Sequence, residues 1–390
     1  MIDSLHKLKP GRCCTAGRIA TSNGQCLLVN ADTAVALSGV DLPEGTLVKV
    51  SGEYDGERLR VEGLTVVHTP TARDETHTGI PLGAALRARA AMYRELRGYF
   101  ERHDFLEVET PVRVMAAGTD PYLETVQCGE SRLQTSPEFA MKRLLSHGCE
   151  RIFQICKAFR GDEITPLHNP EFSILEFYRA WQPVEMVIDD VEALVRLCVP
   201  RLSEVVFERR TMADVVMSSC GFDLQACTSA DALAREISAR GLFTPRATDG
   251  WEEMFFELMV TCIDPYLSGQ PPTFVTHWPA QLAVLARRDP NNADVALRFE
   301  LYVEGIEICN GFEELTDPTE QRTRFQADMD YRSARGLGYE PMPEAFLRAM
   351  EWGLPESSGV AVGLDRLLML RLETRAIRDV LPFWWGAQRF

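Results

Sequence analysis

The amino-acid sequence predicts an α+β protein, with a small all-β domain at the N-terminus and a larger domain in which helices flank an antiparallel sheet. Short strand-like runs separated by turn residues crowd residues 1–70, for example at 26–29, 58–61 and 64–67. Beyond residue 81 the strand-like segments come in groups with helical segments between the groups, which is typical of α+β folds and not of alternating βαβ units. The length of 390 residues also suggests more than one domain.

We expect the chain to divide into three parts. Residues 1–70 have the pattern of a small OB-like β-barrel, residues 71–80 of a polar linker, and residues 81–390 of the main domain. Such barrels often bind oligonucleotides, but residues 1–80 carry eight Lys or Arg against ten Asp or Glu and few aromatic side chains on which bases could stack. A structural or dimer-stabilising module is therefore the favoured interpretation.

Within the main domain the patterns follow in order. A helix is expected after Gly83, because Tyr93, Leu96 and Phe100 recur at helical spacing. A strand at 105–111 follows and ends at its proline. The remaining expectations are strands to about residue 181, helices over 183–270, strands over 273–315, helices over 318–352, and a final strand and helix.

Composition excludes several classes of protein. The formal net charge is −16, which argues against a sequence-independent nucleic-acid binder because such proteins need an excess of positive charge. No apolar run approaches the roughly 18 residues of a membrane span, and the first residues lack the apolar core of a secretory signal. The 11 cysteines are scattered without zinc-ligand spacing. A cytoplasmic protein with reduced thiols is expected.

Residues 159–179 hold the densest set of polar and aromatic side chains and have the pattern of a long hairpin. Strand alternation places Phe172, Glu176 and Tyr178 on one face, where they could line a pocket for a planar base and an amine. Arg160 stands where the first strand meets the loop, suited to gripping a phosphate oxygen. Taken alone, this hairpin is better explained as a half-buried strand pair with ordinary surface charges.

A second hairpin, residues 297–312, strengthens the case for a site. The predicted two-residue turn pairs Glu300 with Cys309. Glu307 then pairs with Tyr302 and becomes a diagonal neighbour of Glu300 on one face. Two carboxylates this close are destabilising unless a cation lies between them, and they suit Mg²⁺ that bridges nucleotide phosphates. The alternative is an acidic solvent-exposed face.

A third stretch, residues 358–370, combines glycines with an arginine. Gly359 and Gly363 frame a strand that gives way to a helix near Asp365. Glycines let a ligand ring lie against the backbone, and Arg366 lies near a helix N-terminus, where anions are favoured. The glycine spacing alone more often indicates close packing.

Together these stretches resemble the three sequence motifs of class II aminoacyl-tRNA synthetases. The first helix with the strand at 105–111 resembles motif 1, the dimer-forming element. The Arg160 hairpin resembles motif 2, and residues 359–366 resemble motif 3. The sequence is similar to lysyl-tRNA synthetase, and more so to its paralogues, the elongation factor P–(R)-β-lysine ligases. Four further stretches carry this resemblance: 135–145, 168–172, 272–275 and 310–317.

The resemblance implies ATP and Mg²⁺ as cofactors and a role for each matching residue. Arg160 and Arg366 would be catalytic, and Glu300 and Glu307 would hold the metal. The residues implied in ATP binding are Arg160, Asp162, His168, Asn169, Phe172, Glu307, Ile308, Gly363 and Arg366. The residues implied in substrate binding are Ser136, Pro137, Glu138, Glu176, Tyr178, Asn310, Glu314 and Ala361. Catalysis would be positioning and charge stabilisation, without a nucleophilic side chain.

Two features depart from the family pattern. Where the family usually has Arg-Asn-Glu in motif 2, the chain has Arg160-Gly161-Asp162, so the contact of the third residue is weakened or shifted to Glu163. The ligases typically lack an N-terminal barrel, which leaves a different acceptor open. Ala361, however, replaces the middle glycine of the synthetases' motif 3, as in the β-lysine ligases. Its methyl group is worth roughly 1 kcal/mol against an α-amino acid.

The resemblance therefore implies an ATP-dependent ligase that activates (R)-β-lysine, or lysine, and transfers it to a lysine side chain of translation elongation factor P. Motif 1 implies a homodimer. Transfer to tRNA is less favoured, because the barrel is short and acidic. Two alternatives stay open: a lysine-activating enzyme that acts on tRNA or a small-molecule amine, and an inactive paralogue that only binds a nucleotide or partner protein. The presence of Arg160, Glu300, Glu307 and Arg366 together argues against the inactive paralogue, which would have no need of the metal pair.

Overall fold

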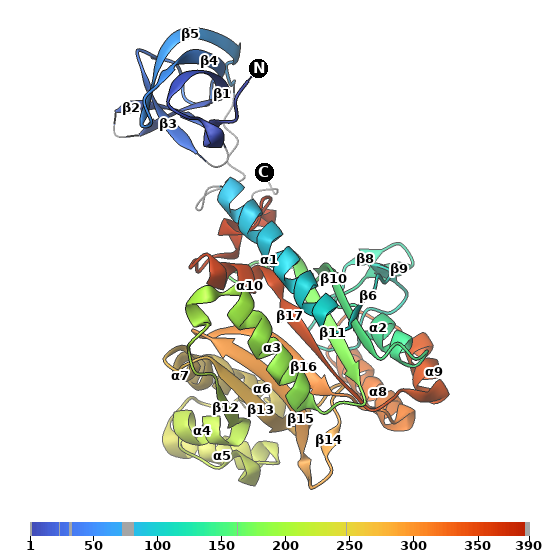
Figure 1. Ribbon diagram of the computed structural model, residues 1–390. Coiled ribbons are helices and arrows are strands. Elements are labelled where there is room, and N and C mark those ends of the chain that lie inside the picture. The colour runs from blue at the N-terminus through green and yellow to red at the C-terminus, as the bar shows by residue number, and fades with distance from the viewer. Residues whose placement is uncertain are drawn as a thin grey trace. The chain divides into compact units, whose positions relative to one another are not determined.

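The computed structural model describes residues 2–22, 24–30, 33–71, 82–161, 163–246 and 248–386. The chain forms two compact units, Met1–Ala91 with Ala376–Phe390, and Met92–Arg375 (Figure 1). Within the described ranges, no helix is both long enough and apolar enough to cross a membrane.

The first unit contains a closed five-stranded β-barrel with strand order β1-β2-β3-β5-β4. Its strands are β1 (Gly11–Ser22), β2 (Gln25–Val29), β3 (Ala34–Ser38), β4 (Leu47–Tyr54) and β5 (Arg58–His68). Alternating side chains such as Ile19, Leu28 and Val48 fill its interior. The predicted runs 58–61 and 64–67 are parts of the single strand β5, which pairs with β4 through a bulge.

The second unit is built on one large sheet with strand order β12-β13-β15-β16-β17-β11-β10-β6. The strands are β6 (Leu106–Glu107), β10 (Arg151–Phe159), β11 (Glu171–Ala180), β12 (Glu208–Thr211), β13 (Thr273–Pro279), β15 (Asn292–Val303), β16 (Ile306–Glu313) and β17 (Ser357–Gly363), with β14 (Arg288–Asp289) paired to β15. Neighbours from β13 to β10 pair antiparallel, as predicted. The outermost pairs, β12–β13 and β10–β6, are parallel, so the sheet is mixed at its edges.

A small second sheet has the order β7-β9-β8, formed by β7 (Arg113–Val114), β8 (Gln127–Cys128) and β9 (Ser131–Leu133). The helices are α1 (Leu82–Arg102), α2 (Glu138–Leu145), α3 (Val184–Cys198), α4 (Met212–Cys220), α5 (Ala230–Arg240), α6 (Trp251–Leu258), α7 (Asp264–Ser268), α8 (Pro318–Ala334), α9 (Glu344–Gly353) and α10 (Leu364–Arg371). The predicted helical regions are confirmed, except that the short strand β12 interrupts the region 183–270. Helix α2, however, lies in a stretch for which only strands were expected, because two turns are too short to show a helical period.

Strand β11 shows how the two faces of the sheet are used. The Phe177 ring packs against that of Phe100 in α1, with the ring centroids 5.2 Å apart, and Arg179 is paired with Asp190 of α3 at 2.5 Å. Helix α3 crosses this face of the sheet in Figure 1. Because side chains alternate along a strand, Glu176 and Tyr178 are directed to the opposite face. That face carries the candidate site.

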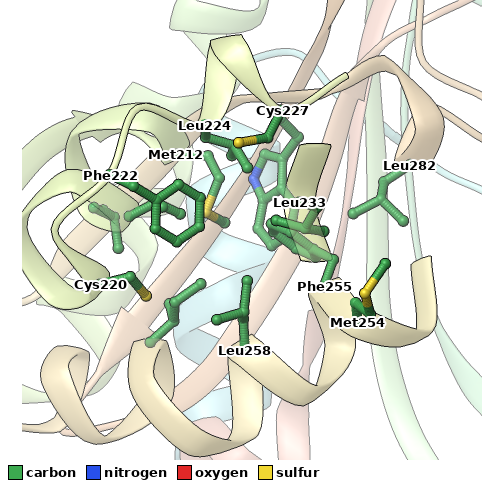
Figure 2. Close-up of a cluster of buried hydrophobic side chains, with 14 of the residues drawn as sticks. Met212, Cys220, Phe222, Leu224, Cys227, Leu233, Met254, Phe255, Leu258 and Leu282 are labelled. Atoms are coloured by element: carbon green, nitrogen blue, oxygen red, sulfur yellow. The ribbon is translucent and has the colours of Figure 1, made fainter. Parts of the chain in front are cut away.

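A helical segment, α4 to α7, lies between β12 and β13 and has its own hydrophobic core. Figure 2 shows Met212, Phe222, Phe255 and Leu258 among the side chains that converge there. A π-helical turn, Met259–Ile263, joins α6 to α7. This core fixes the start of α7 next to the strands that carry the site.

Candidate active site

Arg160 occupies the mouth of the β10–β11 hairpin, as the sequence predicts. Its backbone N–H donates to the carbonyl of Pro170 at 2.9 Å, which closes the loop between the strands. Its guanidinium lies 5.2 Å from the ring centroid of Phe172. The buried Nε atom has no hydrogen-bond partner within the described part of the chain. A buried guanidinium donor left unpaired in this way is suited to an anion.

Arg366 of α10 is held at the same end of the sheet by two neighbours. Its Nη1 donates to the backbone carbonyl of Glu307 at 2.8 Å and lies 3.3 Å from the Glu307 carboxylate. Its Nη2 lies 2.6 Å from Nε2 of His168. A guanidinium can only donate, so Nε2 accepts and Nδ1 carries its proton toward the Thr165 hydroxyl at 2.7 Å.

The imidazole of His168 is neutral at physiological pH. Burial, followed by the positive charge of Arg366, lowers its pKa to about 4, and Arg160 contributes in the same direction. A neutral ring can accept the hydrogen bond from Arg366, whereas a protonated ring could not. His168 therefore orients the arginine without repelling it.

The predicted pairing of Glu300 with Cys309 is wrong. A register shift makes Leu301 the partner of Cys309 and pairs Glu300 with Asn310, while Tyr302 pairs with Glu307 as predicted. The reason is a β-bulge, which sets an extra residue of β16 against β15 and moves the register by one. Glu300 and Glu307 still share one face, because Tyr302 lies across from Glu307 and its hydroxyl donates to Glu300 at 2.5 Å.

Glu300 lies in a buried, charged environment. Burial is the main cause that raises its pKa to about 7, and Glu307 adds to the shift while Arg298 opposes it. Asp264, the first residue of α7, is also close, since burial and Glu307 raise its pKa to about 6. Over the described ranges, no group of three or more His, Cys, Asp or Glu side chains is arranged to hold a metal ion. The acidic pair alone would thus leave most of a metal's coordination sphere to other ligands.

A row of side chains connects the two ends of the site across the sheet. Glu176 of β11 pairs with Ala361 of β17, and Ala361 pairs in turn with Asn310 of β16. Asn310 pairs with Glu300 of β15, so the four residues lie side by side on one face. The side-chain oxygen of Asn310 is buried and has no hydrogen-bond partner among the described residues. It is an acceptor suited to an N–H donor.

Glu176 is the buried carboxylate at the β11 end of this row. The hydroxyls of Ser136 and Tyr178 both donate to its carboxylate, the latter at 3.1 Å. Pro137 then leads into α2, whose first residue is Glu138. Burial, followed by the negative charge of Glu138, raises the pKa of Glu176 to about 8.

Glu138 and Glu314 face one another across a lysine. The ammonium of Lys142 lies 2.5 Å from a Glu138 oxygen and 2.6 Å from a Glu314 oxygen. Gly359 lies beneath, where a Cβ atom would approach the Tyr178 ring to 2.2 Å and Glu314 to 3.0 Å. Only glycine leaves room for these side chains to meet.

The other predicted residues lie near Arg160 and Arg366 or outside the described part of the chain. Asn169 donates to the carbonyl of Glu171 at 2.6 Å and so shapes the hairpin loop. Gly363 precedes α10, and a Cβ atom there would lie 3.7 Å from both the Ile308 carbonyl and the Arg366 side chain. Asp162 lies outside the described residues.

Most of the chain is similar to proteins of known family. The sequence profile of the tRNA synthetases class II (D, K and N) matches residues 81–384. A relative named elongation factor P–(R)-β-lysine ligase, from Klebsiella pneumoniae subsp. pneumoniae, is 40% identical over 317 residues, which cover 76% of this chain and 94% of the relative. A relative of the same name from Salmonella arizonae is 38% identical over 330 residues, which cover 79% of this chain and 98% of the relative. The chain belongs to this ligase family of class II synthetases. The resemblance found in the sequence motifs is thereby confirmed.

Two residues of the site were missed by sequence reasoning. Lys142 had a signal, because it follows Glu138 by four positions and that spacing brings side chains together on a helix. Asp264 had none, because its proximity to Glu307 arises only from how the α4–α7 segment packs on the sheet.

The departure of this ligase-family chain at Gly161 has a structural reason. The Gly161 N–H donates to the Glu124 carbonyl at 2.8 Å. A Cβ atom at Gly161 would approach the Glu124 side chain to 3.0 Å. A larger residue at this position would therefore require the Glu124 side chain to shift.

Proposed function

We propose that this chain is an ATP-dependent ligase that activates (R)-β-lysine as an aminoacyl-adenylate and transfers it to a lysine side chain of elongation factor P. The names and extent of its relatives support this activity. The geometric observation that carries the proposal is the row of Glu176, Ala361, Asn310 and Glu300 across the sheet. This row lies between the acidic side chains that would bind ammonium groups and the end of the site that holds Arg160 and Arg366. An enzyme that attaches an amino acid to a nucleotide needs both kinds of group within one site.

ATP would bind at the arginine end. Arg160 is suited to the α-phosphate, because its unpaired Nε can donate to an oxygen there. Phe172 would stack on adenine, and Arg366 would lie on the ring's other side or at the γ-phosphate. His168, Asn169, Ile308, Gly363 and Asp162 would complete the nucleotide site.

Mg²⁺ would be held by Glu300 and Glu307. Hard carboxylate oxygens suit this ion, which commonly binds through one or two carboxylates plus nucleotide phosphates. When bound, the ion would neutralise phosphate charge. The Arg298 and Tyr302 side chains that contact Glu300 would fix its orientation.

The substrate would lie along the row with its two amines in the acidic pocket. Glu138 would bind the β-amino group, and Tyr178 and Glu314 the terminal ammonium. Ser136, Pro137, Glu176, Asn310 and Ala361 would line the remaining walls. The methyl group of Ala361 lies between Glu176 and Asn310, where it would favour a β-amino over an α-amino arrangement.

The reaction would proceed in two steps. A carboxylate oxygen of the substrate attacks the α-phosphorus in line, a P–O bond forms, and pyrophosphate leaves. The deprotonated amine of the acceptor lysine then attacks the acyl carbon, an amide forms, and AMP leaves. Arg160 and Arg366 would stabilise the charge that develops on phosphate oxygens.

Two assays test the proposal. ATP–pyrophosphate exchange should be clearly faster with (R)-β-lysine than with α-lysine, and equal or reversed preference would remove the substrate assignment. The intact mass of elongation factor P should rise by one lysyl residue after incubation with enzyme, ATP and (R)-β-lysine. Charging of tRNA or of a free amine instead would favour the alternative acceptors, and absence of exchange with any lysine would favour an inactive paralogue.

The KM for the diamino acid should fall as the pH rises from about 6 to about 8. Burial raises the pKa of both Glu176 and Glu314 to about 8, so below that value these carboxyls are protonated in the free enzyme. An ammonium ion binds the ionised form, and each group therefore weakens binding by up to about tenfold per pH unit below its pKa. Exchange rates at saturating ATP across this range measure the effect. A KM that stays constant would contradict it.

We further propose an OB-type barrel, a linker and a catalytic domain at residues 1–70, 71–80 and 81–390. The barrel's strand order and the match of the class II profile from residue 81 support this division. A homodimer through motif 1 is supported by the exposed apolar side chains of Leu106, Val112 and Met115. A translation-factor acceptor implies a cytoplasmic location. We expect no tRNA partner.

A further inference from the structure

Lys142 is a buried lysine in the acidic pocket, which is the group of Glu138, Glu176 and Glu314 around it. Its side chain is 1% exposed, and its ammonium also lies 5.8 Å from the Phe346 ring centroid. A buried ammonium is strongly destabilising unless opposite charges compensate it. Burial acts to lower the pKa of Lys142, but Glu138 and Glu314 outweigh it and hold the pKa above its usual value. The group is therefore a permanent cation inside the substrate pocket.

The acidic pocket contains three carboxyl groups and one ammonium group. Glu176 and Glu314 are each 1% exposed, and Glu138 lies at their side. When all three are ionised and Lys142 is charged, the pocket has an excess of two negative charges. A ligand with two ammonium groups neutralises that excess. A ligand with one ammonium group leaves a buried carboxylate uncompensated, which opposes its binding.

We propose that Lys142 is a positioning residue that determines specificity for a doubly charged amine. Its ammonium lies between Glu138 and Glu314, holds the two carboxyl groups at a fixed separation and favours the ionised form of Glu314, so that each can bind one ammonium group of the substrate. This inference rests on the proposed function, since it concerns how that site selects diamino acids.

The charge of Lys142, and not its bulk, carries this role. Glu138 acts to raise the pKa of Glu314, and Lys142 acts to lower it. Without the ammonium, the pKa of the Glu314 carboxyl would be higher still, and the group would stay protonated to a higher pH. One of the two substrate ammonium groups would then meet a neutral partner.

Lys142→Met and Lys142→Arg test the proposal, with Lys157→Met as the control. Lys157 is a half-exposed lysine paired with Glu171 at 3.4 Å, outside the pocket. The readout is ATP–pyrophosphate exchange with (R)-β-lysine and with 3-aminoheptanoic acid, in which a methyl group replaces the terminal ammonium. In K142M we expect the KM for (R)-β-lysine to rise by about tenfold or more and the preference over the monoamine to fall by a similar factor. The KM should also level off at a higher pH, with a smaller change in kcat.

K142R should keep the wild-type pH profile and most of the preference, because it keeps the charge. Lys142→Ala should regain activity with added propylammonium but not with propanol. If K142M does not fold, this comparison shows whether the charge of Lys142 is what the site needs. Wild-type preference and pH profile in K142M would overturn the proposal. So would equal impairment of K142M and K142R with an unmoved pH profile, which would indicate packing alone. If wild-type enzyme activates no diamino acid, the proposed function fails instead.

Discussion

Replacing Arg160 by alanine is expected to lower the rate of adenylate formation by about 10³-fold, within the range seen when one preorganised donor to a developing oxyanion is removed. The buried Nε of Arg160 has no hydrogen-bond partner in the described ranges, so its donor is free for a phosphate oxygen. The guanidinium also lies over the Phe172 ring, which is proposed to stack on adenine. Its removal would therefore disturb both the phosphate contact and the adenine contact. Pre-steady-state measurement of pyrophosphate release reports this step directly.

Arg151→Ala is the matched control for that variant. Arg151 is the exposed first residue of β10, the strand whose other end leads into Arg160, and we expect exchange close to the wild-type rate. Arg160→Lys should recover only part of the activity, because an ammonium cannot reproduce the planar fork of the guanidinium. Full activity in Arg160→Ala would remove this residue from the site.

Glu307→Ala is expected to abolish detectable exchange, a loss of at least about 10²-fold. The substitution removes a carboxylate proposed to hold Mg²⁺ and also one of the groups that position Arg366, whose Nη1 lies 3.3 Å from it. A Mg²⁺ titration separates these effects: Glu307→Gln should require more Mg²⁺ for half-maximal rate, because the amide is a weaker ligand.

Glu304→Gln serves as the comparison on the same hairpin. Glu304 lies at the turn and is paired with Arg201 and Arg375 at 2.6 Å each, away from the acidic pair. Its variant should keep wild-type exchange and Mg²⁺ dependence. Undiminished exchange in Glu307→Ala would remove the metal assignment.

The hairpin of β10 and β11 was predictable because its information is local. Alternation along ten residues of β11 placed Glu176 and Tyr178 on one face, and the structure joins them by a hydrogen bond of 3.1 Å. Arg160 at the loop was predicted from the same stretch. The family motifs likewise come from contiguous residues.

The register of β15 and β16 was not predictable in the same way. Counting back from a two-residue turn gave the right partner for Tyr302 and the wrong one for Glu300. A bulge depends on how neighbouring strands pack, and no residue type in this hairpin requires one. The structure thereby placed Asn310, instead of Cys309, beside Glu300.

The sequence by itself determined which chemical groups the chain possesses, the order of its motifs, and its ligase family, since these are properties of short contiguous segments. Tertiary structure alone decided the bulge in β16, the approach of Asp264 to Glu307, and the burial of Lys142 between Glu138 and Glu314. Local backbone preferences and side-chain alternation act over a few residues. Strand register, desolvation and the resulting protonation states depend on groups far apart along the chain, which come together only when the sheet and its helices pack.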